Sequence, residues 1–318
     1  MIVLVELFSK DVLFTEGGES MEKKTEDVIM PANWYDALPR KQYESFIRIE
    51  SVDPWFSVYQ IRSNIFAIYE DKHFQEVISY LIIGDEKALL IDTGLGIGDI
   101  RAIVNSLYDG EIIVTHTHTH FDHIGGDWQF DEVNIPDNPV AVTRARRGLS
   151  KEEVEDNMAD GCNSQPYPRG FNREEYCIRP ANRYTVIRNG DVFDLGNIRL
   201  EVIETPGHSP DSLMYLDREN QLLFTGDSFY PATLYAHIKH NDGSDSDFET
   251  YRKSMHMVAD LYSNCTLITS HNEPLRPGIE LIKVARAFDS IAAGGLEYIV
   301  DDRDLKKYVF EDFYIVTS

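Results

Sequence analysis

The chain has 318 residues, of which 42% are hydrophobic, and 54 acidic residues against 30 basic ones give it a formal net charge of −24. This length is enough for a large buried core, whereas such an acidic surface repels phosphate backbones and argues against a nucleic-acid partner. No apolar run reaches the roughly 18–20 residues of a membrane helix, so we expect a cytoplasmic protein without a membrane partner.

Residues 1–54 show no regular apolar periodicity, and we expect them to form an irregular amino-terminal arm. Their apolar start is not preceded by a basic residue, so we do not expect a secretory signal. One domain is expected over residues 55–318, with an insertion at about residues 161–182. Its first elements are strand-like runs at residues 64–70, 77–83 and 88–91 and a helical run at residues 99–108.

A glycine-rich turn, Gly94-Leu95-Gly96-Ile97-Gly98, joins the third strand-like run to this helix. Similar turns hold phosphate groups in dinucleotide-binding folds. Here, however, the spacing is GxGxG rather than GxGxxG, and no acidic residue ends a second strand at about 20 residues downstream. We therefore interpret the segment as a turn into the helix.

The segment His118-Thr119-His120-Phe121-Asp122-His123 follows the apolar run at residues 111–114. Neutral imidazole and carboxylate groups are ligands of borderline divalent ions such as zinc, so the segment predicts a metal site. A ligand frame that began at His116 would put Phe121 where a ligand is required, and phenylalanine cannot bind a metal. We therefore interpret His116 as a strand-end residue close to the ligands.

Residues 144–160 have a charged helical pattern, and the insertion that follows is rich in Gly, Pro, Asn and Arg. The second half repeats the plan of the first, with strands expected at residues 184–187, 192–195, 198–203, 213–216 and 222–225 and helices at residues 248–262 and 277–293. His208, Asp227 and His271 each follow a strand-like run. Loops at strand ends commonly present functional groups, so these three residues are further candidate ligands.

Other histidines and the cysteines are expected to have structural roles. The histidines outside the motifs are His73, His237, His240 and His256. Three cysteines, Cys162, Cys177 and Cys265, form an odd set without a metal-binding spacing, so we expect free thiols. A bridge between Cys162 and Cys177 is the alternative.

Taken in order, Leu90-Ile91-Asp92-Thr93-Gly94, the histidine-rich segment, His208, Asp227 and His271 resemble the metallo-β-lactamase superfamily over roughly residues 60–318. The resemblance implies an α/β fold, the αββα sandwich, with a metal site at the sheet edge. It also implies two divalent metal ions, with zinc expected and manganese or iron as alternatives. In this family pattern His118, His120 and His208 hold one ion, Asp122, His123 and His271 hold the other, and Asp227 bridges them.

Asp92 allows two interpretations, a turn residue or a hydrogen-bond acceptor for a metal-bound histidine. Tyr230, three residues after Asp227, is either a catalytic residue, as the resemblance to N-acyl homoserine lactonases implies, or a packing aromatic. We assign catalysis to Asp122 and Tyr230. The aromatic segment 229–235 is expected to accommodate an apolar acyl group.

The closer resemblance is to acyl-CoA thioesterase-like members of the superfamily. It implies a metal-dependent hydrolase that cleaves a thioester, ester or lactone by attack of a hydroxide held between the two metal ions. The expected partner is therefore a small acyl substrate, and a homodimer is possible. The alternatives are a mono-iron oxidoreductase similar to persulfide dioxygenases and a β-lactamase.

Overall fold

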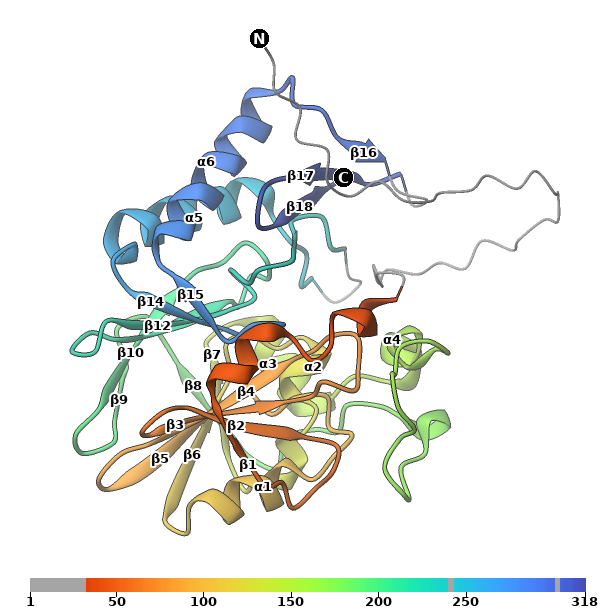
Figure 1. Ribbon diagram of the computed structural model, residues 1–318, viewed down its shortest axis with the longest axis vertical. Coiled ribbons are helices and arrows are strands. Elements are labelled where there is room, and N and C mark those ends of the chain that lie inside the picture. The colour runs from red at the N-terminus through yellow and green to blue at the C-terminus, as the bar shows by residue number, and fades with distance from the viewer. Residues whose placement is uncertain (1–32, 240–242, 301–303) are drawn as a thin grey trace, which may run out of the picture.

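The computed structural model describes residues 33–239, 243–300 and 304–318. Two large β-sheets lie one above the other, with helices on the outer side of each sheet (Figure 1). This arrangement is the predicted αββα sandwich. None of the helices in the described segments combines the length and the apolar composition needed to traverse a bilayer.

The first sheet has eight strands, which lie side by side in the order of the sequence. They are β1 (Ile47–Ile49), β2 (Ser57–Arg62), β3 (Ile65–Tyr69), β4 (Ile78–Ile83), β5 (Lys87–Ile91), β6 (Glu111–Thr115), β7 (Val133–Pro136) and β8 (Tyr184–Ile187). Neighbours from β1 to β5 are antiparallel, and neighbours from β5 to β8 are parallel. The loops that follow β5, β6 and β7 therefore emerge at the same edge of the sheet, the usual place for a ligand site.

The second sheet has six strands in the order β15-β14-β12-β11-β10-β9, and a small third sheet has the order β13-β18-β17-β16. The strands of the second sheet are β9 (Val192–Asp194), β10 (Arg199–Glu204), β11 (Leu213–Asp217), β12 (Leu222–Gly226), β14 (Thr266–Thr269) and β15 (Leu275–Pro277). Those of the third are β13 (Thr233–Tyr235), β16 (Ile299–Val300), β17 (Lys306–Val309) and β18 (Tyr314–Thr317). Parallel pairing of β12 with β14 brings the segments after these two strands together.

The helices connect strands along the chain and cover the outer faces of the sheets. They are α1 (Ile100–Leu107), α2 (Phe121–Ile124), α3 (Pro139–Arg147), α4 (Lys151–Val154), α5 (Phe248–Tyr262) and α6 (Ile279–Ala293). Short 3-10 helices are η1 (Trp34–Ala37), η2 (Lys41–Ser45), η3 (Asp127–Gln129), η4 (Glu155–Met158) and η5 (Arg173–Glu175). The amphipathic helices α5 and α6 lie together above the second sheet (Figure 1).

Three apolar layers hold the sandwich together. Tyr80 and Leu89 of the first sheet pack with Tyr215 and Phe224 of the second in the central layer. The outer face of the first sheet packs against α1 and α3, and the outer face of the second packs against α5, α6 and the third sheet. Burial on both faces explains why strands such as β4 and β11 read as continuous apolar runs rather than as alternating ones.

Two segments differ from the sequence prediction. The helical pattern at residues 144–160 is divided into α3, α4 and η4, because Gly148 adopts φ +69° and Ser150 starts α4 with a capping box. The expected arm is not irregular where it is described, since it contains η1, η2 and β1, and β1 pairs with β2. Three-residue strands such as β1 leave too short a pattern to be recognised from sequence. The predicted domain boundary near residue 54 stays a prediction.

Candidate metal centre

The histidine-rich segment occupies the edge of the first sheet where β6 ends at Thr115. His120 precedes the first residue of α2 in an extended conformation, and Asp122 and His123 lie within this four-residue helix. The chain therefore changes from strand to helix inside the motif. This change directs the residues on either side of it to different partners.

His118, His120 and His208 form one group of nitrogen atoms. His118 Nε2 lies 3.0 Å from His120 Nδ1, and His208 Nε2 lies 3.1 Å from the same atom. His208 arrives from the loop after β10, and Ser246 Oγ donates a hydrogen bond to its carbonyl oxygen at 2.7 Å. Three imidazole nitrogens at such separations match one face of a tetrahedral metal site.

Asp122, His123 and His271 form a second group beside the first. Asp122 Oδ2 lies 3.7 Å from His123 Nε2 and 3.8 Å from His271 Nε2. His271 comes from the turn between β14 and β15, and its position is fixed because its Nδ1 lies 2.6 Å from the carbonyl oxygen of Gln75. One carboxylate and two imidazoles are again a donor set suited to a divalent cation.

Asp227 lies between the two groups and turns one carboxylate oxygen towards each. Its Oδ2 is 3.9 Å from His118 Nε2 and 3.6 Å from His208 Nε2, whereas its Oδ1 is 3.2 Å from His123 Nε2 and 2.9 Å from His271 Nε2. The preceding Gly226 has φ +51° and lies so close to Thr117 that a Cβ there would approach Thr117 Cβ to 2.6 Å. All seven residues predicted as ligands thus lie in one cluster.

The cluster has donor atoms that the protein itself leaves unsatisfied. Within the described residues, the buried atoms His123 Nε2, His271 Nε2 and Asp227 Oδ1 have no hydrogen-bond partner of acceptable geometry. Buried polar groups are normally paired, and an exception calls for an explanation. Convergence of these atoms on a shared space fits a bound cation, for which they would be ligands.

Asp92 is not one of the candidate ligands, but it contacts one of them and the backbone beside the motif. Its Oδ2 lies 2.9 Å from His123 Nδ1, and the same carboxylate accepts hydrogen bonds from the backbone N–H and the hydroxyl of Thr117, each at 2.8 Å. The interpretation of Asp92 as an acceptor for a histidine is therefore confirmed. Such an acceptor fixes the ring orientation and leaves Nε2 as the atom that faces a metal.

His116 faces away from the candidate ligands. Its Nε2 lies 3.0 Å from Asp127 Oδ1 and its Nδ1 lies 3.7 Å from Asp92 Oδ1. Burial opposes a charge on this ring, but the two carboxylates outweigh burial and raise the pKa of His116 to about 9. His116 thus pairs with Asp127 and not with the candidate ligands, which agrees with its interpretation as a neighbour of the ligands.

The first histidine group is electrostatically suited to metal binding. Burial holds the pKa of His118 well below its usual range, and burial also lowers the pKa of His208 to about 4. Both rings are therefore neutral near pH 7, the state in which an imidazole nitrogen is a ligand. Burial raises the pKa of Asp227, but the adjacent rings of His271 and His123 outweigh this and hold it well below its ordinary value.

Tyr230 lies beside the cluster, with its ring centroid 4.8 Å from that of His271. Its hydroxyl donates a hydrogen bond to the carbonyl oxygen of Thr233 at 2.6 Å. Burial raises the pKa of Tyr230 well above its usual range, so the phenol keeps its proton. The expected acyl-binding role of segment 229–235 is wrong for Phe229 and Leu234, because both are fully buried in the core beneath α5 and α6.

Several residues that support the ligand loops were not predicted from the sequence. Asp211 accepts hydrogen bonds from the backbone and the hydroxyl of Thr119 and from the hydroxyl of Ser209, and so ties the two ligand loops together. Arg144, which is 3% exposed, donates to the carbonyl oxygen of Thr119 at 2.7 Å. Asp211 lies in a polar turn directly after His208, and this position in the sequence could have indicated its supporting role. No pattern in the sequence pointed to Gln75.

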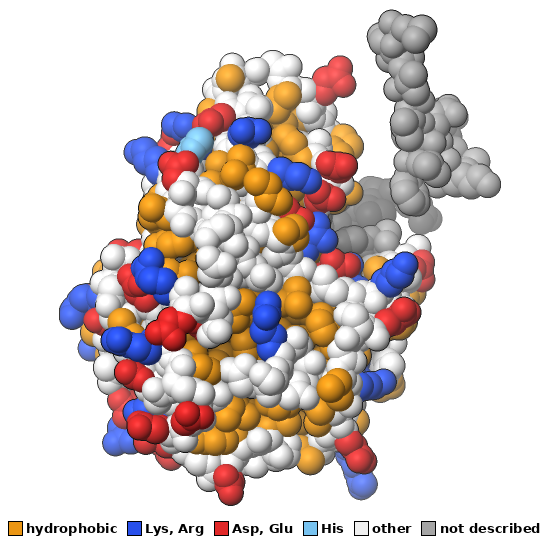
Figure 2. Space-filling view, turned by 60° about the vertical axis from the view of Figure 1, so that its left-hand side comes forward, with side chains coloured by type: hydrophobic (Ala, Val, Ile, Leu, Met, Phe, Trp, Pro, Cys, Tyr) orange, Lys and Arg blue, Asp and Glu red, His pale blue; other side chains and the backbone are white. Residues whose placement is uncertain are grey.

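The surface around the sandwich is mixed in charge. Figure 2 shows Lys and Arg side chains dispersed among Asp and Glu, with hydrophobic side chains between them. All three cysteines are free thiols, as predicted, and Cys177 is the exposed one. The bridge between Cys162 and Cys177 does not form.

Comparison with known proteins agrees with this geometry. Residues 76–271 match the family model described as the metallo-beta-lactamase superfamily. The chain is 30% identical over 204 residues to the acyl-coenzyme A thioesterase MBLAC2 of Gallus gallus, covering 60% of this chain and 72% of the relative. It is 27% identical over 198 residues to a probable metallo-hydrolase of Bacillus subtilis, covering 62% of this chain and 84% of the relative.

Among solved structures, a metallo-beta-lactamase from Pontibacter korlensis has a TM-score of 0.50 at 19% identity and covers 74% of this chain and 99% of that one. An archaeal superfamily protein from Sulfolobus tokodaii has a TM-score of 0.50 at 18% identity and covers 76% of this chain and 92% of that one. These likenesses support the fold. Together with the family match over residues 76–271, they establish that the chain belongs to the metallo-beta-lactamase superfamily.

Proposed function

We propose that the chain is a dinuclear metal-dependent hydrolase of acyl thioesters. The observation that carries the proposal is Asp227, whose two carboxylate oxygens each face a separate group of candidate ligands. A carboxylate in that position is placed to bridge two cations. The preference for a thioester is supported by the thioesterase names of relatives at 30% and 28% identity.

Divalent cations held at such a site supply a water nucleophile ionised near neutral pH and an electrophile for the acyl carbonyl. The protein's own residues would orient this chemistry. Asp92 binds Nδ1 of His123, so that Nε2 of this ring faces the cluster. The carbonyl oxygen of Gln75 binds Nδ1 of His271 in the same way. The carboxylate of Asp122 completes the second group, and this is the catalytic role that we propose for it.

Tyr230 is proposed to donate a hydrogen bond to the substrate. Its phenol is neutral, and it lies next to His271, so it can serve as a donor without carrying charge into a buried site. In the structure the hydroxyl donates its hydrogen bond to the carbonyl oxygen of Thr233. When a substrate binds, the hydroxyl would donate to the acyl oxygen instead. Tyr230→Phe is expected to lower kcat by about tenfold while leaving the metal content unchanged. An unchanged kcat would reduce Tyr230 to a packing residue.

Hydrolysis of matched acyl substrates tests the proposal. Protein purified with zinc is offered a thioester, an oxygen ester and a lactone with the same acyl chain, and the thioester is expected to give the highest kcat/KM. His118→Ala should abolish this activity, because it removes one nitrogen from the first group. His256→Ala is the matched control, since this half-exposed histidine lies on α5 and pairs with Asp289.

Two outcomes would replace the proposal. One iron atom per chain, together with oxygen consumption on a persulfide, would favour the oxidoreductase alternative. Efficient turnover of a β-lactam by the zinc-loaded protein would favour a β-lactamase. Absence of any acyl hydrolysis by protein that contains two metal ions would reject a thioesterase outright.

A further inference from the structure

A cavity of about 700 Å³ lies outside the metal centre. Its walls come from Asp53, from the glycine-rich turn before α1, from the segment that follows α2, and from the insertion at residues 168–179. Small-molecule sites typically measure roughly 300–1,000 Å³. The insertion, which has no assigned role so far, thus builds one side of a space large enough for part of a substrate.

The cavity and the metal centre share one edge of the first sheet. The glycine-rich turn follows β5 and the candidate ligands follow β6, and these two strands are parallel neighbours. Gly125, which lines the cavity, directly follows α2, the helix that carries Asp122 and His123. A four-residue helix is only about 6 Å long at 1.5 Å per residue. The cavity wall therefore begins two residues after His123, at the end of this short helix.

The presence of glycine in this turn is explained by close packing rather than by phosphate binding. A Cβ on Gly96 would lie 2.2 Å from the carbonyl oxygen of Gly125, so the turn and the end of α2 can touch only through glycine. This close contact joins the cavity wall to the helix of the metal centre.

Two arginines from the insertion give the cavity an anion-binding character. Arg169 and Arg179 line it, and neither forms an ion pair anywhere in the described part of the chain. Carboxylates outnumber cations in this chain of net charge −24, yet none of the described ones pairs with these two side chains. Arginine is the side chain best suited to phosphate groups, because its planar fork donates two parallel hydrogen bonds.

The acidic residues of the lining are mostly engaged. Asp53 accepts hydrogen bonds from the backbone N–H groups of Trp55 and Asp99, and Asp99 accepts one from Ala102 at the start of α1. Glu175 is exposed at η5. The third arginine of the lining, Arg101, is bound to the carbonyl oxygen of Gln129. Arg169 and Arg179 are therefore the cations left to meet an anionic ligand.

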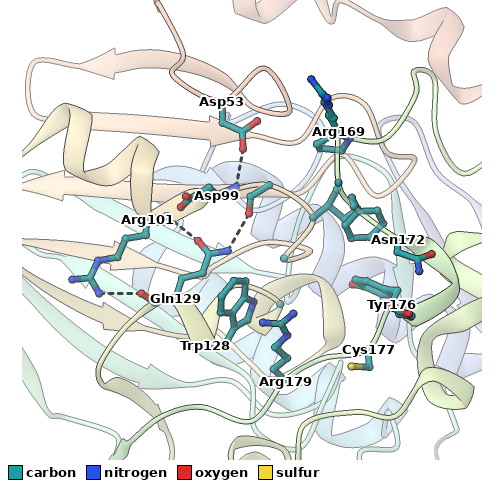
Figure 3. Close-up of a pocket in the computed structure, with 18 residues that line it drawn as sticks. Asp53, Asp99, Arg101, Trp128, Gln129, Arg169, Asn172, Tyr176, Cys177 and Arg179 are labelled. Atoms are coloured by element: carbon teal, nitrogen blue, oxygen red, sulfur yellow. Dashed lines mark hydrogen bonds between the residues drawn. The ribbon is translucent and has the colours of Figure 1, made fainter.

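Trp128 adds a flat surface for an aromatic base. It is 38% exposed, and the guanidinium carbon of Arg179 lies 4.2 Å from its ring centroid. Figure 3 shows Trp128 and Arg179 side by side, with Arg169 at the opposite end of the drawn residues. Bases stack on aromatic rings and on arginine planes, and phosphates pair with arginine. One wall thus offers stacking and charge together.

We infer that this cavity, lined by Trp128, Arg169 and Arg179, binds the phosphorylated nucleotide end of a coenzyme A thioester while the acyl end lies at the metal centre. The inference rests on the proposed thioesterase function and adds a substrate class to it. The pantetheine arm of such a substrate, which is longer than α2, would join the two ends.

The test compares two thioesters with the same acyl chain on the metal-loaded full chain, an acyl-coenzyme A and an acyl-N-acetylcysteamine that lacks the nucleotide. Wild type is expected to prefer the acyl-coenzyme A. The double variant Arg169→Ala, Arg179→Ala should lower kcat/KM for acyl-coenzyme A by about tenfold or more, mainly through KM. Its kcat/KM for the short thioester should be unchanged, which also shows that the variant is folded.

The matched control combines Arg199→Ala with Arg218→Ala, because these two exposed arginines remove the same charge from another part of the molecule. Equal effects of the double variant on both thioesters, or no effect on either, would overturn the inference and leave the thioesterase proposal intact. Calorimetric titration with adenosine 3′,5′-bisphosphate gives a readout that does not require turnover. Binding that the double variant loses supports the inference even if no thioester is cleaved, and failure of wild type to bind overturns it.

Discussion

Asp92 organises the candidate metal centre although it is not itself one of the candidate ligands. It contacts His123 through one oxygen and Thr117 through both, and it also faces the charged ring of His116. Burial raises the pKa of Asp92, but His123 and His116 outweigh burial and hold it well below the ordinary value. The carboxylate is therefore ionised near neutral pH, where it acts as an acceptor.

Removal of this acceptor should weaken metal binding without changing a ligand. Asp92→Ala is expected to reduce the affinity for the metal ions by roughly 10–100-fold, because the ring of His123 loses its orientation. Asp92→Asn keeps an oxygen at the same place and should lose less. Competition against a chelator of known affinity measures both variants. Equal affinity in wild type and Asp92→Ala would show that His123 is held by its packing alone.

At the scale of elements, the loop between β3 and β4 connects the amino-terminal segment with the metal centre. Arg40, which follows η1, donates two hydrogen bonds to Glu76, and the hydroxyl of Tyr69 donates another. Glu76 has φ +46°, and the adjacent Gln75 presents the carbonyl oxygen that lies 2.6 Å from His271 Nδ1. The buried ion pair therefore fixes the loop that orients a candidate ligand.

Arg40→Ala should lower the free energy of unfolding by about 3 kcal/mol, because it leaves the carboxylate of Glu76, which is 2% exposed, without its cation. Chemical denaturation of the metal-loaded protein measures the change. The double variant Arg40→Ala, Glu76→Gln removes the unpaired charge and should recover part of the loss. If the single and double variants are equally stable, the ion pair does not hold this loop.

Glu70, directly after β3, should make the free energy of unfolding depend on pH. Burial raises the pKa of Glu70 to about 7 from its ordinary 4.5, although hydrogen bonds from Trp55 and from the backbone of Leu95 oppose the shift. Between these two values the folded chain keeps a proton that the unfolded chain has lost. The contribution of Glu70 to the unfolding free energy therefore falls as the pH rises through this window, by at most about 1.4 kcal/mol per pH unit.

Denaturation at several pH values between 4.5 and 7, for wild type and Glu70→Gln, isolates this contribution. The variant should lose the part of the downward slope that belongs to Glu70, because an amide has no proton to release. Parallel curves for the two proteins would mean that Glu70 is ionised throughout the window in the folded protein.

For the whole molecule, local patterns in the sequence predicted the strands and the candidate ligands, whereas the layers were implied by the family resemblance. Continuous apolar runs mark β4, β5 and β11, and the alternation of His118, His120 and Asp122 marks the motif. Contacts between distant segments could not be predicted in this way. Gln75 lies 196 residues from His271, and the cavity is assembled from four segments, so no local pattern reveals either. Residues 1–32, the first part of the expected arm, lie outside the described part of the chain.

The count of metal ions per chain tests the central claim most directly. Protein purified without added metal is analysed by elemental mass spectrometry and then reloaded with zinc after chelation, with His256→Ala as the control and Asp227→Ala as the test variant. Two divalent ions per chain are expected in wild type and control, and Asp227→Ala should retain fewer, because it removes the carboxylate that faces both ligand groups. One ion or none in reloaded wild type, or two in Asp227→Ala with unchanged affinity, would contradict the account.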